Sequence, residues 1–212
     1  YPLFILHNNF TIMIMKRFLP LLLLLLAGIT ACSPGDDAAS DTDTAPVETA
    51  EDVEPAEPEA AEPEGTIVTS TNGTVQLTVP DDWQETDELN DVAILQAANP
   101  VDEKYVIVID DTKEDFADAT LEQYAEITSE MFLDILTDPN VSEPVSLTIN
   151  GNSALQQQVE GSIDNINVIY LQTNVETDTH FYQVLTWTLK SRFDEHESIF
   201  KAVTESFQEV GE

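Results

Sequence analysis

Cysteine is nearly absent from this sequence, since Cys32 is the only one among 212 residues. A disulfide needs two cysteines, so no disulfide framework can form within the chain. The folded part of the chain must therefore draw its stability from the packing of a hydrophobic core.

Basic residues are almost as scarce. The sequence has seven Lys and Arg against 41 Asp and Glu, which gives a formal net charge of −34. Nucleic-acid binding rests on Lys and Arg that neutralise phosphates, so we expect no nucleic-acid partner. Contact with anionic lipid headgroups is unfavourable for the same reason. Basic protein surfaces and divalent cations stay open as partners, while solubility or a saline habitat would explain the acidity without any partner.

The residue patterns of common catalytic and metal sites are also missing. His180 and His196 are too few and too far apart in sequence to suggest a zinc site. The sequence has no Gly-x-Ser-x-Gly nucleophile motif and no glycine-rich phosphate loop. Carboxylate pairs occur everywhere on so acidic a chain, so they do not indicate a glycosidase. We therefore expect no catalytic residue, no metal ligand and no cofactor.

The longest apolar run, from Phe18 to Ala31, has 14 residues, whereas a membrane-spanning helix needs about 20. Lys16 and Arg17 precede this run and small residues end it, which is typical of a secretory signal. Its last residues with the cysteine, Ile29-Thr30-Ala31-Cys32, resemble the bacterial lipobox. We therefore expect lipidation of Cys32.

This signal also suggests how the beginning of the chain is divided. Met13 or Met15 would place the two basic residues at the head of an ordinary signal, so residues 1–14 are interpreted as an upstream mis-start and residues 15–31 as the lipoprotein signal peptide. The residue after the cysteine is Ser33, whereas an aspartate at that position is typical of inner-membrane retention. A lipid-anchored protein is thus expected in the outer membrane of a diderm cell, or on the outer face of the plasma membrane of a monoderm cell.

Residues 32–65 are predicted to be a disordered acidic linker that begins with the lipidated cysteine. Ser33 to Gly65 carry 12 acidic residues, no basic residue and five prolines. This composition cannot bury enough apolar surface to offset the entropy of ordering. Like charges and prolines should extend the linker, so that it holds the following domain away from the membrane.

Residues 66–212 have the length and the mixed pattern of one α+β domain. Asn150-Gly151 supplies a tight hairpin turn between two alternating segments. The apolar patterns predict, in chain order, strands at 74–79, 92–98, 105–109, 145–149 and 154–160, a turn at 161–165, and two long central strands at 166–173 and 181–189.

Two helices are predicted as well. Thr120 and Gln123 form a capping box, and helical spacing extends to Thr137, after which Pro139 stops the helix. A second helix runs from Phe193 to about Val210, with a buried face that contains His196 as a packing residue.

The outer face of the first helix carries acidic residues at intervals of four: Glu122, Glu126, Glu130 and Asp134. Each like-charged pair destabilises an isolated helix by about 0.2–0.5 kcal/mol, so packing must hold this helix in place. Together with Trp83, which lies in an acidic loop, these residues form our candidate partner surface. The alternatives are a solvated helix face and a core position for Trp83.

The order of these elements resembles that of PsbP-like domains. The segment Leu77-Thr78-Val79-Pro80-Asp81-Asp82-Trp83 is similar to their opening strand with its Pro-x-x-Trp, and the end of the chain, with its Ser206-Phe207 pair, is similar to their terminal helix. The group includes PsbP, DcrB-type envelope proteins, LpqN-type lipoproteins and Mog-like nuclear-import factors. The resemblance implies an antiparallel sheet flanked by helices, an α/β/α sandwich, and a role in attachment to other proteins without catalysis.

From these observations we expect a membrane-anchored extracytoplasmic lipoprotein that is a non-catalytic interaction or assembly module for an unidentified envelope protein. One alternative is a binding protein for a cation or small ligand, which would have a pocket with convergent polar groups. A third is a hydrolytic enzyme without a recognisable motif. The sequence does not predict an oligomeric state.

Overall fold

The computed structural model describes residues 65–116 and 119–210. The predicted signal peptide, the predicted lipidation site Cys32 and nearly all of the predicted linker lie outside these residues. In chain order, the helices and strands are β1 (Thr66–Thr69), β2 (Val75–Val79), β3 (Gln84–Glu85), β4 (Leu95–Asn99), β5 (Lys104–Thr112), α2 (Leu121–Ile135), β6 (Thr137–Val141), β7 (Val145–Ile149), β8 (Asn152–Ile163), β9 (Ile166–Glu176), β10 (His180–Leu189), α3 (Phe193–Glu205) and β11 (Gln208–Glu209).

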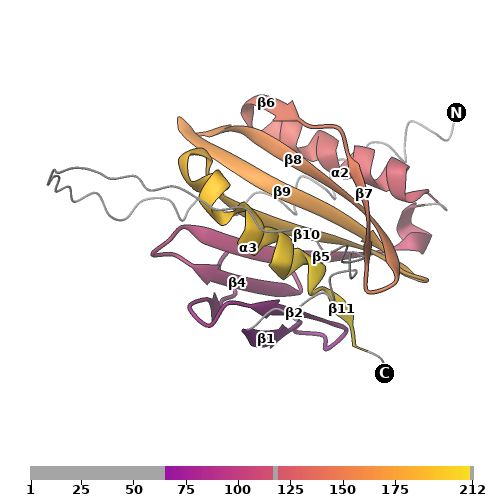
Figure 1. Cartoon of the computed structure of the whole chain (residues 1–212). Coiled ribbons are helices and arrows are strands. Elements are labelled where there is room, and N and C mark those ends of the chain that lie inside the picture. The colour runs from indigo at the N-terminus through magenta and orange to yellow at the C-terminus, as the bar shows by residue number, and fades with distance from the viewer. Residues whose placement is uncertain (1–64, 117–118, 211–212) are drawn as a thin grey trace, which may run out of the picture.

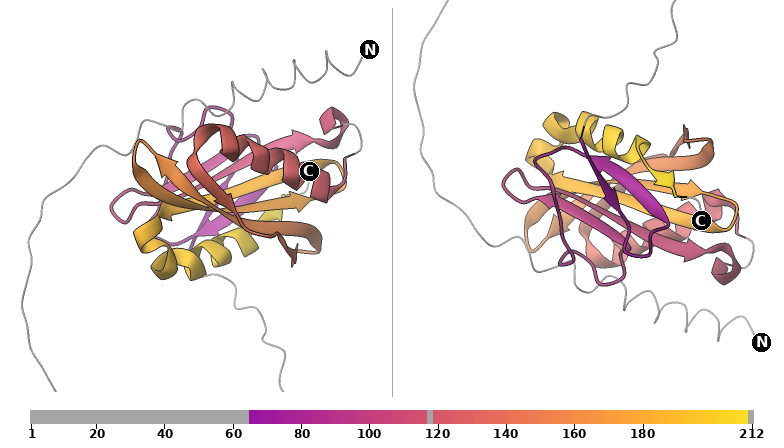
Figure 2. Two further views of the ribbon diagram at one scale, coloured as in Figure 1. Left: turned by 90° about the horizontal axis from the view of Figure 1, so that it is seen from above. Right: turned by 90° about the horizontal axis from the view of Figure 1, so that it is seen from below.

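The described strands form two sheets, and all their pairs are antiparallel. The main sheet has the order β3-β4-β5-β10-β9-β8, and both β6 and β7 pair with the remaining edge of β8. The smaller sheet has the order β1-β2-β11. Helix α2 covers one face of the main sheet, while α3 and the smaller sheet lie on the other face (Figures 1 and 2). The predicted α+β fold, an antiparallel sheet flanked by helices, is confirmed, with the smaller sheet as an addition.

The central strands of the main sheet are buried on both faces, as predicted for 166–173 and 181–189. Val184 and Leu185 are neighbours in β10 and point to opposite faces, yet they are only 0% and 1% exposed. Val184 packs among side chains of α3 and the smaller sheet, whereas Leu185 packs under α2. Burial of one such side chain stabilises the fold by about 1.5–3 kcal/mol.

The predicted strand at 92–98 begins too early. A turn occupies its first residues, because the side-chain oxygen of Asn90 accepts a hydrogen bond from the N–H of Val92 at 2.9 Å. The carbonyl of Asn90 also accepts one from the N–H of Ala93 at 3.3 Å. The strand proper, β4, therefore runs from Leu95 to Asn99.

The capping box of α2 is confirmed, but the helix ends two residues earlier than predicted. The Thr120 hydroxyl accepts from the N–H of Gln123, and the Gln123 side chain accepts from the N–H of Thr120. Leu136 then takes an extended conformation, with φ −98°. Thr137 and the residues after it form β6 and pair with β8, so Pro139 lies in an edge strand, where its missing N–H is tolerated.

The predicted turn at 161–165 is too long. Strand β8 continues through Gly161 to Ile163, and only Asp164 and Asn165 form the turn, with φ values of 51° and 67°. A glycine is needed at this strand position because Leu136, the residue after α2, comes very close to it. A Cβ at this position would lie 2.9 Å from the Cβ of Leu136.

The predicted terminal helix is also too long, since α3 ends at Glu205. The hydroxyl of Ser206 donates to the carbonyl of Val203 and accepts from the N–H of Thr78 at 2.8 Å, so it joins the end of α3 to β2. Gln208 and Glu209 then pair with β2 as β11, and Val210 is exposed. The Ser-Phe pair is therefore the point where the chain leaves the helix.

Candidate functional site

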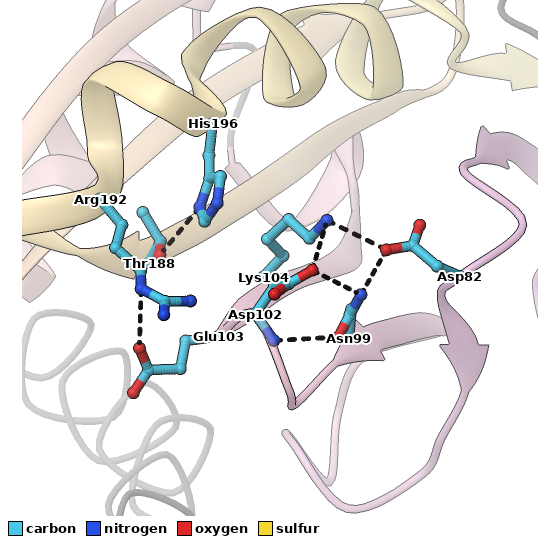
Figure 3. A network of polar contacts seen from close by, with 8 residues as sticks. All are labelled: Asp82, Asn99, Asp102, Glu103, Lys104, Thr188, Arg192 and His196. Carbon is cyan, nitrogen blue, oxygen red and sulfur yellow. Dashed lines mark hydrogen bonds and ion pairs between the residues drawn. The ribbon is translucent and has the colours of Figure 1, made fainter. Parts of the chain in front are cut away.

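A network of polar side chains surrounds Lys104, the first residue of β5 (Figure 3). Lys104 is buried, with 6% of its surface exposed. Its Nζ lies 3.1 Å from Oδ2 of Asp82 and 3.3 Å from Oδ2 of Asp102. The two aspartate side chains are half-exposed, so water reaches the carboxylates but scarcely reaches the lysine.

Asn99, the last residue of β4, holds the two carboxylates in place. Its side-chain amide donates to Oδ2 of both Asp82 and Asp102, and its side-chain oxygen accepts from the N–H of Asp102 at 3.0 Å. The network thus joins the turn after β2 to the turn between β4 and β5. These contacts therefore hold the two turns together, although 17 to 22 residues separate the bonded side chains in the sequence.

The charge of Lys104 governs the ionisation of Asp82. Burial raises the pKa of this carboxyl, but the hydrogen bond and the positive charge of Lys104, with a further hydrogen bond from Asn99, outweigh it and leave the pKa below its ordinary value. Asp82 is therefore held as a carboxylate. The network thus holds Asp82 and Lys104 as an ion pair.

His196 in α3 and Arg192, the residue directly before α3, lie beside this region (Figure 3). His196 is 5% exposed, its Nδ1 lies 3.4 Å from the Thr188 hydroxyl, and its ring meets Phe200 edge-on. Burial lowers the pKa of His196. Arg192 forms an ion pair at 3.5 Å with Glu103. His196 is thus a buried packing residue, in the position predicted from the sequence.

The four acidic residues of the candidate partner surface lie together on the outer face of α2. Glu122, Glu126, Glu130 and Asp134 are all exposed. The helix contains no Lys or Arg, and Leu133, which is 51% exposed, lies beside this acidic stripe. Hydrogen bonds from its own N–H and from the Thr120 hydroxyl lower the pKa of Glu122. Whether the stripe binds a partner stays a prediction.

The structure does not place Trp83 with these residues. Trp83 is 5% exposed and packs edge-on against Phe200 of α3, with ring centroids 6.4 Å apart. It belongs to the hydrophobic cluster between the main sheet and α3, whereas the stripe lies on α2, beyond the opposite face of the sheet. Trp83 therefore occupies the core position that was its alternative, and the acidic stripe is the exposed part of the candidate surface.

Beneath α2, a row of buried amide and hydroxyl side chains crosses the main sheet. Gln157 donates to Gln172 at 3.0 Å, Gln172 donates to Thr128 at 2.9 Å, and Thr128 donates to Asn174 at 3.3 Å. Because α2 covers this amide row, it is part of the interior and not an open binding site.

An open hollow of about 410 Å³ lies between β7 and α3. Its lining includes Val145, Gln156, Gln158, Leu171, Glu197 and Lys201.

Across residues 65–116 and 119–210, no group of three or more His, Cys, Asp or Glu side chains could hold a metal ion. None of the helices in that part of the chain is long and apolar enough to cross a membrane.

Sequence reasoning missed the Lys104 network. A signal was present, because Lys104 directly precedes the continuously apolar segment from Tyr105 to Ile109 in a chain with very few basic residues. A lysine at the start of a buried strand needs carboxylate partners. The identity of those partners depends on the fold, since Asp82 is 22 residues away.

Comparison with known proteins shows the fold. The chain matches the solution structure of the cyanobacterial PsbP protein, CyanoP, from Synechocystis, with 14% identity and a TM-score of 0.51 over 68% of this chain and 92% of that one. It also matches the crystal structure of LpqN from Mycobacterium tuberculosis, with 18% identity and a TM-score of 0.51 over 69% of this chain and 90% of that one. No protein-family model matches the sequence. No curated protein matches it either. The chain therefore has a PsbP-like fold, as the resemblance in the sequence implied.

Proposed function

We propose that this protein is a non-catalytic interaction or assembly module that a lipid on Cys32 tethers to the outer side of a bacterial membrane. The tether confines the domain to one membrane face, which raises its effective concentration for any partner on that face. The partner we propose is an envelope protein with a basic surface.

The observation that carries this proposal is the acidic stripe of α2. Its four carboxylates are exposed, at regular spacing, on a helix with no basic residue. They weaken the isolated helix, so a binding role would account for a feature that stability alone does not favour. Leu133 beside them offers an apolar contact at the same surface.

Two further points support the envelope setting. The segment from Ile29 to Cys32 resembles a lipobox, although it lies outside the described residues. LpqN, which shares the fold, is described as involved in cell envelope biogenesis. A shared fold is weak support for a shared role, so the surface itself must be tested.

The test is affinity capture after crosslinking in intact cells, with three matched forms of the full chain. One form reverses Glu126, Glu130 and Asp134 to Lys. A control form reverses three exposed acidic residues of α3, on the opposite face of the main sheet, for the same change of net charge: Asp194, Glu195 and Glu205. We expect a dominant partner with the wild type and the control but not with the stripe variant. Equal capture by all three forms would refute the role of the stripe.

The tether is tested separately with Cys32→Ala. The expected result is loss of the protein from the membrane fraction and loss of the captured partner. If the protein stays in the membrane fraction after this change, the lipid anchor is wrong even when the stripe proves correct.

A further inference from the structure

An uncharged segment stands out on this acidic protein. From Pro144 to Val159 the sequence contains no Asp, Glu, Lys, Arg or His. This segment forms β7 and most of β8, which are joined by the turn at Asn150 and Gly151. The hairpin lies at the outer edge of the main sheet (Figure 1).

Strand β7 is an edge strand with exposed apolar surface. In the described part of the chain it pairs with β8 alone. Val145 is 59% exposed, Ser146 and Thr148 are exposed, and Leu147 is half-buried. Natural proteins usually protect such edges with charged residues, prolines or bulges, because an open edge can pair with another strand. Within β7 there is no such protection.

The tight turn determines which backbone groups of β7 are open. Asn150 and Gly151 have φ values of 49° and 86°, the conformation of a two-residue hairpin turn. The two residues that flank such a turn exchange backbone hydrogen bonds, and so does every second residue pair further along the hairpin. Ile149, Leu147 and Val145 therefore direct their N–H and C=O groups toward β8. The N–H and C=O groups of Ser146 and Thr148 consequently point outward from the sheet.

The strand is also self-complementary. Its sequence, Val-Ser-Leu-Thr-Ile, alternates apolar and hydroxyl residues and has the same order of classes in both directions. A second β7 that runs antiparallel, with the two-fold axis at Leu147, places Ser146 opposite Thr148 of the second copy. These are the residues with outward backbone groups, so both of them find hydrogen-bond partners. Val145 then lies beside Ile149 of the second copy, on the face that carries α3.

We propose that β7 is a dimerisation strand, which joins two copies of this chain into one continuous sheet. Charge supports a second copy as the occupant, because two strongly acidic molecules can approach most closely where neither carries charge. The acidic linker at 33–64 is a poorer occupant, since its carboxylates and prolines do not match an uncharged, apolar edge. This inference does not depend on the lipid anchor or on a partner of α2.

The first test is sedimentation of residues 32–212 with Cys32→Ser, which retain every described residue. We expect a concentration-dependent dimer that strengthens as salt screens the repulsion between the copies. Ser146→Pro removes an outward N–H from each copy and should raise the dissociation constant about tenfold or more. Val145→Glu should also weaken the dimer, whereas Ile67→Glu, at a residue with 58% exposure on the edge strand β1, should not. A chain that stays monomeric up to about 1 mM overturns the proposal, and so does a dimer that Ile67→Glu disrupts and the β7 variants do not.

The second test fixes the register. With Cys32→Ser, Leu147→Cys is the only cysteine and faces its own copy across the axis at the short Cα separation of about 4.5 Å that suits a disulfide. Thr148→Cys is the matched control, because the two copies of this residue lie on a diagonal beyond disulfide reach. Mild oxidation should give a covalent dimer with Leu147→Cys only. Crosslinking of Thr148→Cys, or of neither variant, contradicts this arrangement.

Discussion

At the scale of single residues, Lys104 depends on its carboxylate neighbours because it is a buried charge. Its ammonium is buried, while Asp82 and Asp102 are half-exposed. The two sides of this ion pair are therefore unequal. Loss of the lysine leaves two carboxylates that water can hydrate, but loss of the carboxylates leaves a buried positive charge with no counter-charge.

This asymmetry gives a prediction for stability. The double variant Asp82→Asn, Asp102→Asn should lower the free energy of unfolding by about 3 kcal/mol, whereas Lys104→Met should stay within about 1 kcal/mol of the wild type. Urea denaturation at neutral pH measures both values. A loss in Lys104→Met as large as in the double variant would show that the carboxylates need the lysine as much as it needs them.

The contribution of Asp82 to the stability of the fold should also depend on pH. The pKa of Asp82 in the folded protein lies below its ordinary value of 3.8, so its contribution to stability is complete above that value and is lost as the pH falls through the folded-state pKa. The difference between the wild type and Asp82→Asn should therefore narrow only in acid below about pH 3.8.

At the scale of helices and strands, α2 shows how packing overrides local charge. Its buried face includes Leu121, Tyr124 and Phe132, and its capping box closes the first turn. On the other face, each pair of like charges four residues apart in the stripe destabilises the helix. Packing on the main sheet must therefore supply the stability that the helix lacks by itself.

A single substitution in the stripe tests this balance. Glu126→Lys converts two like-charged pairs, with Glu122 and Glu130, into two opposite-charged pairs, which should stabilise the protein by about 1 kcal/mol. Glu88→Lys makes the same change of charge in a loop and should have a smaller effect. Thermal unfolding of the two variants side by side separates the local effect from that of net charge. Equal shifts would mean that net charge alone matters.

The elements that were predicted correctly are those with a strong local signal. The capping box at Thr120 and the Asn150-Gly151 turn need only a few adjacent residues, and the central strands β9 and β10 have long apolar runs. By contrast, β6 and β11 are short and polar, and each exists because a neighbouring strand offers an open edge. Their pairing depends on tertiary contacts that no local pattern encodes. For the same reason, the sequence left two positions open for Trp83, one on the partner surface and one in the core.

At the scale of the whole molecule, negative charge dominates. Every Lys and Arg in the described part of the chain forms an ion pair with a carboxylate. These residues are Lys104, Lys113, Lys190, Arg192 and Lys201. Acidic residues outnumber basic ones by 41 to seven in the full sequence, so most carboxylates have no Lys or Arg to balance their charge. Repulsion among these carboxylates therefore opposes the compact state.

Salt should accordingly stabilise the protein. An increase in NaCl from low concentration to about 0.5 M shortens the Debye length to a few ångströms and should raise the melting temperature by about 3 °C. Calorimetry across a series of salt concentrations measures this shift. A lower melting temperature in salt would mean that the ion pairs contribute more to stability than the repulsion removes.

The position of β11 has a consequence for the order in which the molecule folds. Gln76 in β2 bonds to Gln208 in β11 across a sequence separation of 132 residues. Ser206, which joins the end of α3 to β2, is likewise 128 residues from Thr78, whose N–H donates to the Ser206 hydroxyl. Contacts of such long sequence separation slow folding. The chain must therefore emerge from the ribosome at least as far as Glu209 before the smaller sheet can close, and until then the nascent chain keeps an unpaired edge along β2.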